Sequence, residues 1–257
     1  MNSFDSLPLW AFFLIVFLVS LFWTECGYRS GARRRKSDTR EPDAPIGTVV
    51  AATLSLLAFI LGFTFNVALD RFDDRREAVL SEANAIGTTY LRADFFEGET
   101  KEQTRKQLRE YVQLRVNGIL ATPEFRPALT RTEELQNLLW GTAVKFGKDH
   151  QSPIAALYIN SLNEVIDMHA KRITLELHSR VPLSVWLVLF AVSALAMLSV
   201  GFYFGLSGNR SWAETMVLII TFALVMLLVA DLDRPYEGFI NASQQPMIDL
   251  QKQIGAP

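Results

Sequence analysis

The chain has 257 residues, half of them hydrophobic, with 25 basic against 27 acidic residues. This nearly neutral balance gives no reason to expect nucleic-acid binding, which needs a strongly basic surface. The single cysteine, Cys26, excludes an intrachain disulfide and a cysteine-based zinc site. No histidine spacing, serine nucleophile motif or phosphate loop indicates an enzyme, so we predict no catalytic residue, no metal and no cofactor.

Four segments are nearly free of charge, and each is long enough for a transmembrane helix, which needs about 20 apolar residues. The sequence therefore predicts an all-α membrane protein with four transmembrane helices and a soluble helical domain between the second and the third. The predicted parts are a first span within 1–23, a basic loop at 24–45, a second span at 46–69, a soluble domain at 70–180, spans at 181–206 and 212–230, and a tail at 231–257. We expect the first span to be retained, because Asp5 precedes it without any base and no small-residue cleavage site follows.

The loop between the first two spans predicts the orientation of the chain. It contains six bases, Arg29, Arg33, Arg34, Arg35, Lys36 and Arg40. Short loops rich in Lys and Arg stay in the cytoplasm. We therefore expect the N-terminus, the central domain and the C-terminus outside the cytoplasm. Bases that flank the central domain, such as Arg75 and Arg172, favour the opposite orientation, but long domains follow the rule poorly.

Helical spacing of apolar residues continues from the second span to about Phe95. These residues are Leu69, Phe72, Val79, Leu80, Ala83, Ile86 and Tyr90. After a turn at 96–99, we expect a helix over 100–120 with Leu108, Val112, Arg115 and Ile119 along one side.

Two further helices and a short tail helix complete the predicted domain. Thr130 with Glu133 predicts a helix start of the capping-box type, followed by an apolar face of Leu135, Leu138, Leu139, Ala143 and Phe146. Ser152–Pro153 predicts the next start, because serine favours the N-cap and proline the first turn. Residues 243–254 predict a short amphipathic helix, with Met247, Leu250 and Ile254 on one side.

Polar residues within the second span are the best candidates for a functional site. Polar groups are costly in lipid, so they tend to face a bundle interior or water. The pore-lining candidates are Thr53, Ser55, Phe59, Phe63, Asn66 and Asp70. The alternative is that the hydroxyls bond back to their own helix and the aromatic rings face lipid.

Charged residues follow the second and the fourth spans. The first group contains Arg71, Asp74 and Arg75, and the second contains Asp231, Asp233 and Arg234. We expect Arg71 or Arg75 to pair with one of these acids. A charge band at the membrane surface is the alternative.

Two motifs resemble those of a bacterial family called bestrophin-like. They are EANAIGTTYLRA at Glu82–Ala93 and DLDRPYEG at Asp231–Gly238. The resemblance implies two spans, a helical insert and two more spans in a bacterial inner (plasma) membrane. Bestrophins themselves imply a pentameric anion channel whose second span lines the pore with aromatic rings, here Phe59, Phe63 and Phe65. They also imply a cytosolic insert, opposite to the orientation that the charges favour.

Together these observations predict a homo-oligomeric ion channel whose second span lines the pore. The bestrophin resemblance favours anions and the acids near the pore mouth favour cations. The partners implied are the lipid bilayer, further copies of the chain and a permeating ion. The alternative is a non-conducting scaffold or sensor whose helical domain binds a protein partner. A transporter or membrane enzyme is a third hypothesis.

Overall fold

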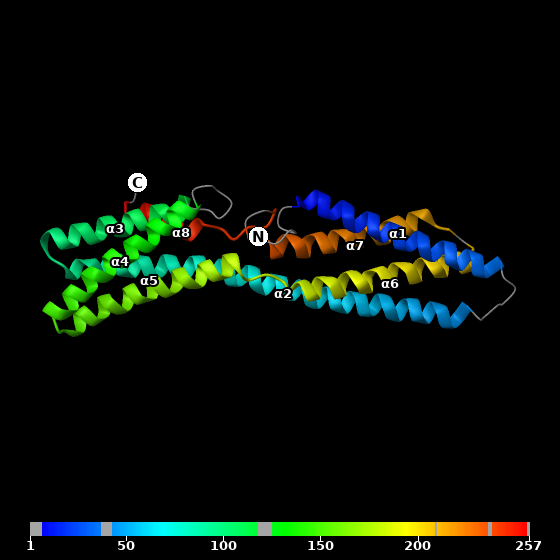
Figure 1. Cartoon of the computed structure of the whole chain (residues 1–257), viewed down its shortest axis with the longest axis horizontal. Helices are drawn as coiled ribbons and strands as arrows, with labels where there is room; N and C mark the ends of the chain where they lie inside the picture. The colour runs from blue at the N-terminus through cyan, green and yellow to red at the C-terminus, as the bar shows by residue number, and fades with distance from the viewer. Residues whose placement is uncertain (1–6, 37–42, 118–124, 209, 236–237, 256–257) are drawn as a thin grey trace. The chain divides into compact units, whose positions relative to one another are not determined.

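The computed structural model describes the whole chain except residues 1–6, 37–42, 118–124, 209, 236–237 and 256–257. Every regular element in these described parts is a helix (Figure 1), which confirms the predicted all-α class. The elements are α1 (Leu9–Lys36), α2 (Asp43–Arg92), the 3₁₀ helix η1 (Ala93–Phe95), α3 (Gly98–Asn117), α4 (Phe125–Asp149), α5 (Pro153–Leu177), α6 (Leu183–Ser207), α7 (Trp212–Asp233) and α8 (Gln245–Gln253).

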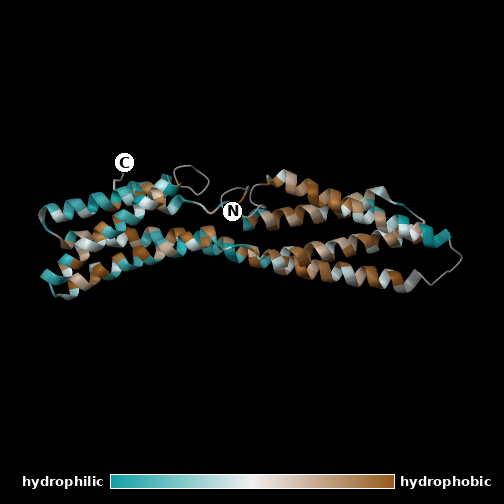
Figure 2. Ribbon diagram, viewed as in Figure 1, coloured by the Kyte–Doolittle hydropathy of each residue, from teal (hydrophilic) through white to brown (hydrophobic). Residues whose placement is uncertain are grey.

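The chain divides into two compact units. We call the first the membrane unit, because it holds α1, α6, α7 and the first part of α2, whose helices are long and apolar enough to cross a membrane. The second, the soluble unit, holds the rest of α2 with η1, α3, α4, α5 and α8. Figure 2 shows nearly continuous hydrophobic colouring along the helices of the membrane unit and alternating colouring in the soluble unit.

Glycines let α1 and α6 pack backbone to backbone in the membrane unit. Gly27 and Gly31 of α1 face Gly201 and Gly205 of α6, and a Cβ added to any of the four would overlap a carbonyl oxygen of the opposite helix. Small residues four apart allow this close approach in membranes, where van der Waals packing drives helix association. These two glycine pairs therefore fix the contact between α1 and α6.

Helix α2 is one uninterrupted helix of 50 residues, as the spacing of apolar residues predicted. Its apolar periodicity passes from the span into the soluble unit without a proline or a glycine turn. Beside α6, a Cβ on Gly47 would contact the Tyr203 ring at 3.6 Å.

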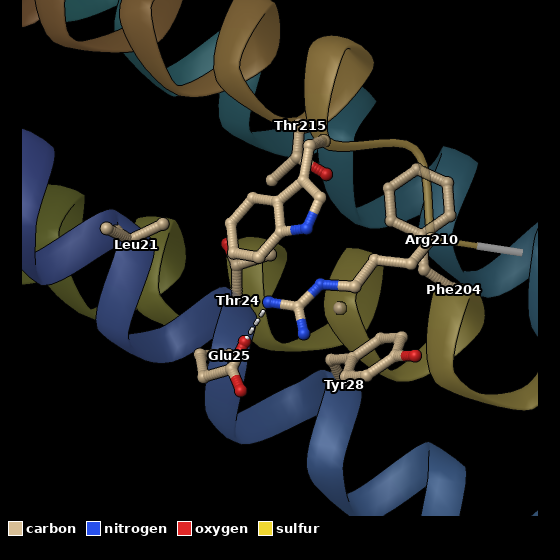
Figure 3. Close-up of a pocket in the computed structure, with 9 residues that line it drawn as sticks. Leu21, Thr24, Glu25, Tyr28, Phe204, Arg210 and Thr215 are labelled. Carbon is tan, nitrogen blue, oxygen red and sulfur yellow. Dashed lines mark hydrogen bonds and ion pairs between the residues drawn. The ribbon is translucent and has the colours of Figure 1, made fainter. Parts of the chain in front are cut away.

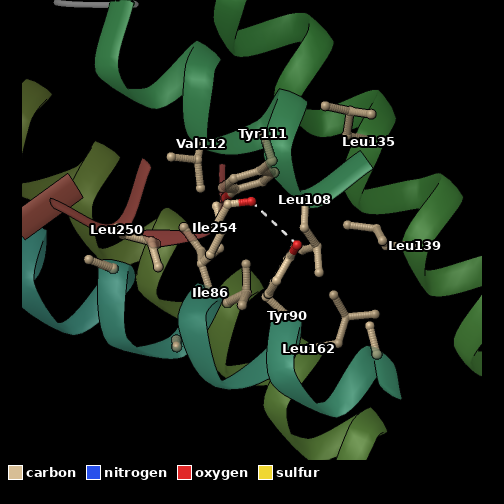
Figure 4. Close-up of a cluster of buried hydrophobic side chains, with 14 of the residues drawn as sticks. Ile86, Tyr90, Leu108, Tyr111, Val112, Leu135, Leu139, Leu162, Leu250 and Ile254 are labelled. Carbon is tan, nitrogen blue, oxygen red and sulfur yellow. Dashed lines mark hydrogen bonds between the residues drawn. The ribbon is translucent and has the colours of Figure 1, made fainter. Parts of the chain in front are cut away.

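The soluble unit has its own hydrophobic core, to which each of its α-helices contributes (Figure 4). Fully buried members include Ile86, Leu108, Tyr111, Leu139 and Leu162. Replacing one such leucine by alanine typically costs about 2–5 kcal/mol. This core holds the α3–α4–α5 bundle against α2.

The predicted short helix is present as α8, and the tail packs into the same core through Met247, Leu250 and Ile254, a contact that was not predicted. The Ile254 carbonyl oxygen accepts a hydrogen bond from the Tyr90 hydroxyl at 3.3 Å (Figure 4). It also accepts one from Arg109 Nε at 2.9 Å. The tail from Asn241 onward is thus an integral part of the soluble unit.

The predicted basic loop at 24–45 is wrong in its extent. Helix α1 continues to Lys36, and α2 already begins at Asp43. Arginine and lysine are good helix formers, and in the last turn they complement the negative end of the helix dipole. Pro45 falls in the first turn of α2, where a backbone N–H has no helical partner to lose.

Helix α4 also begins earlier than predicted, at Phe125 rather than near Thr130. Pro127 lies in its first turn, where proline is tolerated, so it does not break the helix. The Thr130 hydroxyl donates to the Arg126 carbonyl at 3.2 Å within the helix and is not a cap. Leu80 and Leu138, predicted on apolar faces, are about half exposed. Ile119 and the segment around Thr122 and Pro123 lie outside the described residues.

The start of α5 is as predicted. Ser152 is its N-cap, and its hydroxyl accepts a hydrogen bond from the Ala155 amide at 3.3 Å. Helix α5 ends at Leu177, and Pro182 then caps a new helix, α6.

Candidate functional site

The predicted pore-lining residues fall almost entirely on one face of α2. In an α-helix each residue turns about 100°, so residues at steps of three and four share a face. Ser55, Phe59, Phe63, Asn66 and Asp70 follow these steps, and all five are exposed in the single chain. We call these five residues the exposed face of α2. The side chains of Phe59 and Phe63 are 72% and 61% exposed.

The opposite face of the same helix is the packed one. Leu57, Leu61, Thr64 and Ala68 are buried, and their mean direction lies about 170° from that of the exposed face at 100° per residue. The Thr64 hydroxyl donates to the Ile60 carbonyl at 2.8 Å. The second span thus packs with one stripe only and leaves the stripe with the polar candidates uncovered.

Thr53 does not belong with the other candidates. It lies toward the packed side of α2, and its hydroxyl donates to the Val49 carbonyl at 2.8 Å. This is the local backbone bond that the alternative interpretation expected. Asn66 behaves differently, because its side-chain amide donates to the Asp70 carboxylate at 3.2 Å on the exposed face.

The charges that follow the second span are sorted by helix face. Asp70, Asp73, Asp74 and Glu77 are exposed and lie on the side of the exposed face of α2. The helical rotation places Arg71 and Arg75 on the packed side. Arg75 is 3% exposed. Arg71 donates from Nη1 to the Ser179 hydroxyl at 2.9 Å, and Arg76 lies at the flank of the acidic side.

Asp231 and Asp233 bind backbone amides at the end of α7. Asp231 is 3% exposed and accepts from the Phe239 amide at 2.9 Å, while Asp233 accepts from the Val181 amide at 2.8 Å. Gly238 packs so closely on the Asp231 carboxylate that a Cβ there would overlap it. The motif after α7 therefore folds back on the helix end. The predicted pairing of these acids with Arg71 or Arg75 stays a prediction, and Tyr236 and Glu237 lie outside the described residues.

A buried charge cluster in the soluble unit was not predicted. We call it the Glu82 cluster: Glu82, Tyr111, Arg115, His169, Arg172 and Glu176, none of them more than 5% exposed. The Glu82 carboxylate lies 3.0 Å from Arg115 Nε, 2.7 Å from Arg172 Nη1 and 3.5 Å from His169 Nδ1.

Arg172 joins the Glu82 cluster to the C-terminal tail. Its Nε donates to Glu176 at 2.7 Å, and its Nη2 donates to the Gln244 side-chain oxygen at 2.8 Å. The cluster thus ties α2, α3 and α5 to the segment that leads into α8.

The electrostatics of the Glu82 cluster favour its ionised form. Burial alone would raise the pKa of Glu82, but Arg115, the nearby His169 and Arg172 together hold that pKa well below its usual range. Burial and the nearby Glu82 charge raise the pKa of Tyr111, whose hydroxyl donates toward Glu82 at 3.4 Å. A carboxylate shared by two arginines is therefore fixed in the middle of the bundle.

A sequence signal for the cluster exists in helical spacing. Glu82, Arg115 and Arg172 each interrupt an otherwise apolar face, for example between Val79 and Ile86 on α2. A charge at a core position needs an opposite charge beside it. The sequence contains the members of the cluster but does not specify which of them pair.

A small cavity of about 20 Å³ lies in the membrane unit where α1 meets the turn between α6 and α7 (Figure 3). The Arg210 guanidinium lies between the rings of Tyr28 and Trp212, 4.5 Å and 3.8 Å from their centroids. It also donates to Glu25 at 2.5 Å. The cavity is too small to bind a small-molecule ligand, so we interpret the Arg210 contacts as an anchor for the turn between α6 and α7. In the described parts of the chain, no group of three or more His, Cys, Asp or Glu could hold a metal ion.

The fold and these sites define the class: an α-helical membrane protein with four apolar helices, in which one long helix continues into a helical domain. The sequence matches the Bestrophin-like domain over residues 12–247, nearly the whole chain, and the protein belongs to this family. This confirms the resemblance that the two motifs indicated. A comparison with curated proteins finds no significant match.

Solved structures of mutant forms of a bacterial bestrophin homologue from Klebsiella pneumoniae have a similar fold. One has a TM-score of 0.65 at 15% identity, covering 94% of this chain and 98% of that one. A second has 0.65 at 16%, covering 94% and 97%, and a third has 0.66 at 17%, covering 94% and 93%. At such identities the similarity concerns the fold.

Proposed function

We propose that the protein forms an oligomeric ion channel in the bacterial inner membrane, and that the exposed face of α2 lines its pathway. The observation that carries this proposal is the division of α2 into two faces. One face packs within the chain, and the other presents Ser55, Asn66 and Asp70 together with two phenylalanines. Membership of the Bestrophin-like family supports the same function.

Lipid is a poor environment for this face. Polar residues within membrane spans are costly in lipid and usually face a bundle interior or water. Further copies of the chain arranged around an axis would cover the flanks of α2 and leave the polar stripe facing a water-filled path. Closed rings of identical subunits are the common form of such assemblies.

Phe59 and Phe63 are the proposed constriction. They are one helical turn apart on the exposed face of α2, between Ser55 and Asn66. A ring of aromatic side chains from several subunits makes a narrow apolar passage, and such passages gate conduction by losing their water.

The acids that continue the exposed face of α2 favour cations. Asp70, Asp73, Asp74 and Glu77 are exposed on this side, whereas Arg71 and Arg75 lie on the packed side. The field at the proposed mouth is therefore negative even with Arg76 at its flank. Rings of acidic side chains concentrate cations. This arrangement argues against the anion preference that the bestrophin resemblance implied.

Currents of the purified protein in planar bilayers test the proposal. Phe63→Ala should raise the unit conductance by widening the apolar ring, and Asp70→Asn should lower the cation-to-anion permeability ratio. Leu187→Ala on α6 is a control, because Leu187 is equally exposed, at 61%, but lies outside the proposed path. Its conductance should equal that of the wild type. A protein that carries no ion across a range of pH and calcium would favour the non-conducting scaffold instead.

We also propose the orientation in the membrane that the basic residues of the first loop predict. The end of α1 with Arg33, Arg34, Arg35 and Lys36 would face the cytoplasm, and the soluble unit and both termini would lie outside. The four bases in the last turn of α1 support this placement through the positive-inside rule.

A further inference from the structure

The outward side of α1 carries a stripe of exposed apolar residues. Leu14, Ile15, Leu18 and Phe22 are between 44% and 60% exposed, and they follow helical steps of three and four. Gly27 and Gly31 face α6 from the opposite side of the same helix. The apolar stripe therefore lies on the side of α1 that faces away from α6.

The same side becomes basic at the C-terminal end of α1. Arg29, Arg33 and Lys36 are spaced at steps of four and three, and all three are exposed. At 100° per residue, their mean direction lies about 170° from that of the two glycines and coincides with the apolar stripe. One helix face thus offers a surface for acyl chains and, directly beyond it, three cationic side chains.

Helix length places the change from apolar to basic at a membrane boundary. Residues 9–28, about 20 in number, span about 30 Å of helix, which matches the hydrocarbon core. Arg29 then lies at the edge of the core and Arg33 about 6 Å beyond it, within the headgroup layer. Tyr28 and Trp212, which enclose Arg210 at this level (Figure 3), are of the residue types that gather at such boundaries.

Among the residues that the structure describes around Glu25, one acid pairs with two bases. The single Glu25 carboxylate accepts from Arg29 Nε at 2.9 Å and from Arg210 Nη2 at 2.5 Å. One carboxylate therefore faces two guanidinium groups, and the Arg29 side chain remains 71% exposed. A guanidinium whose Nε is occupied still presents its terminal nitrogens, which suit the oxygens of a phosphate.

We propose that this face of α1 is a binding surface for anionic phospholipids. Their acyl chains lie along Leu14, Leu18 and Phe22, and their phosphodiester groups bind Arg29, Arg33 and Lys36. The surface offers an apolar site for the acyl chains and, next to it along the helix, a basic site for the phosphate, in the order in which a phospholipid carries them. A soluble phosphate would use only the basic part.

Lipid binding to the purified full-length protein in detergent tests this proposal. Native mass spectrometry should show phosphatidylglycerol bound more tightly than phosphatidylcholine with the same acyl chains. In Arg33→Gln/Lys36→Gln, Arg29 and its pair with Glu25 stay intact, and glutamine keeps the helix propensity of the two positions. Each base near an anionic surface contributes about 1 kcal/mol, so the double variant should bind phosphatidylglycerol about 30-fold more weakly at low ionic strength.

The control is Lys145→Gln/Lys148→Gln, which removes the same charge from two exposed positions of α4 and should leave lipid affinity unchanged. Glycerol phosphate, the headgroup without chains, should not compete at the concentration at which phosphatidylglycerol saturates. The proposal is overturned if Arg33→Gln/Lys36→Gln binds phosphatidylglycerol like the wild type, if the control loses as much affinity, or if phosphatidylcholine or glycerol phosphate binds equally well.

Discussion

Removal of the Glu82 carboxylate should destabilise the soluble unit severely. The carboxylate is fully buried and lies within 3.0 Å of two guanidinium groups, those of Arg115 and Arg172. In Glu82→Gln the side chain keeps its size but loses its charge. Arg172 still has Glu176 at 2.7 Å, whereas Arg115 loses the ion pair found for it here.

Breaking a buried pair by removing one partner costs about 3–5 kcal/mol, because the other charge stays buried without compensation. For a chain of this size, 1 kcal/mol corresponds to about 2–4 °C in Tm. Glu82→Gln should therefore lower Tm by on the order of 10 °C. Thermal unfolding in detergent, followed by far-UV circular dichroism, measures this shift. Glu77→Gln removes an exposed carboxylate from the same helix and should change Tm little.

Replacement of both members of the pair provides a sharper test. Well-packed hydrophobic residues in place of a buried ion pair are often neutral or stabilising. Glu82→Leu/Arg115→Met should therefore recover part of the stability that Glu82→Leu alone loses. The argument for a charge-based role is refuted if Glu82→Gln melts like Glu77→Gln, or if the double variant is less stable than the sum of its single changes.

The Glu82 cluster also predicts a dependence of stability on pH. The folded-state pKa of Glu82 lies below its ordinary value near 4.5. A depressed carboxyl pKa contributes stability above the unfolded pKa, and this contribution is lost as the pH falls toward the folded pKa. Between about pH 4.5 and pH 2 the wild type should thus lose more stability than Glu82→Gln does.

Three other expectations concern the membrane unit. Gly201→Ala should lower Tm, because the new Cβ would overlap the Thr24 carbonyl. Gly62→Ala is the control and should leave Tm unchanged, because no atom lies within 4 Å of its added Cβ. Equal Tm values for the two variants would contradict the close α1–α6 contact. Asp231→Ala should also destabilise the fold, by about 1–3 kcal/mol of unfolding free energy, and so lower Tm, because the Phe239 amide loses the buried Asp231 carboxylate as its acceptor. An unchanged melting curve would make Asp231 dispensable. A reporter that fluoresces only in the cytoplasm, fused after Pro257, should stay dark; bright fusions would reverse the proposed orientation.

The fold class could be predicted because the signals are local and strong. Uncharged runs identified the spans, and apolar spacing identified α2 as one helix through both units. Ser152 and Pro153 identified the start of α5. The errors at the starts of α2 and α4 share a cause, because proline is tolerated in the first turn of a helix, as at Pro45 and Pro127. The longer α1 has another cause, since arginine and lysine are good helix formers.

Pairing between distant segments was harder to predict. The glycines of α1 and α6 are four apart in each helix, but their partnership depends on which spans are neighbours. The Glu82 cluster joins residues up to 90 positions apart along the chain. The shared face of the candidate residues could be predicted, because helical rotation alone collects Ser55, Phe59, Phe63, Asn66 and Asp70 on one side of α2, while their role in lining a pore stays a prediction. The same rotation should have separated Thr53 from them.

Thiol accessibility during conduction tests the central claim most directly. Cys26 is the single cysteine, so Cys26→Ser provides a cysteine-free background. With Asn66→Cys in that background, a charged water-soluble thiol reagent should reduce the current in planar bilayers, because position 66 would face the aqueous path. Leu61→Cys, on the packed face of α2, should be insensitive. Conduction that the reagent leaves unchanged at position 66, or blocks only at position 61, would contradict a pathway lined by the exposed face of α2.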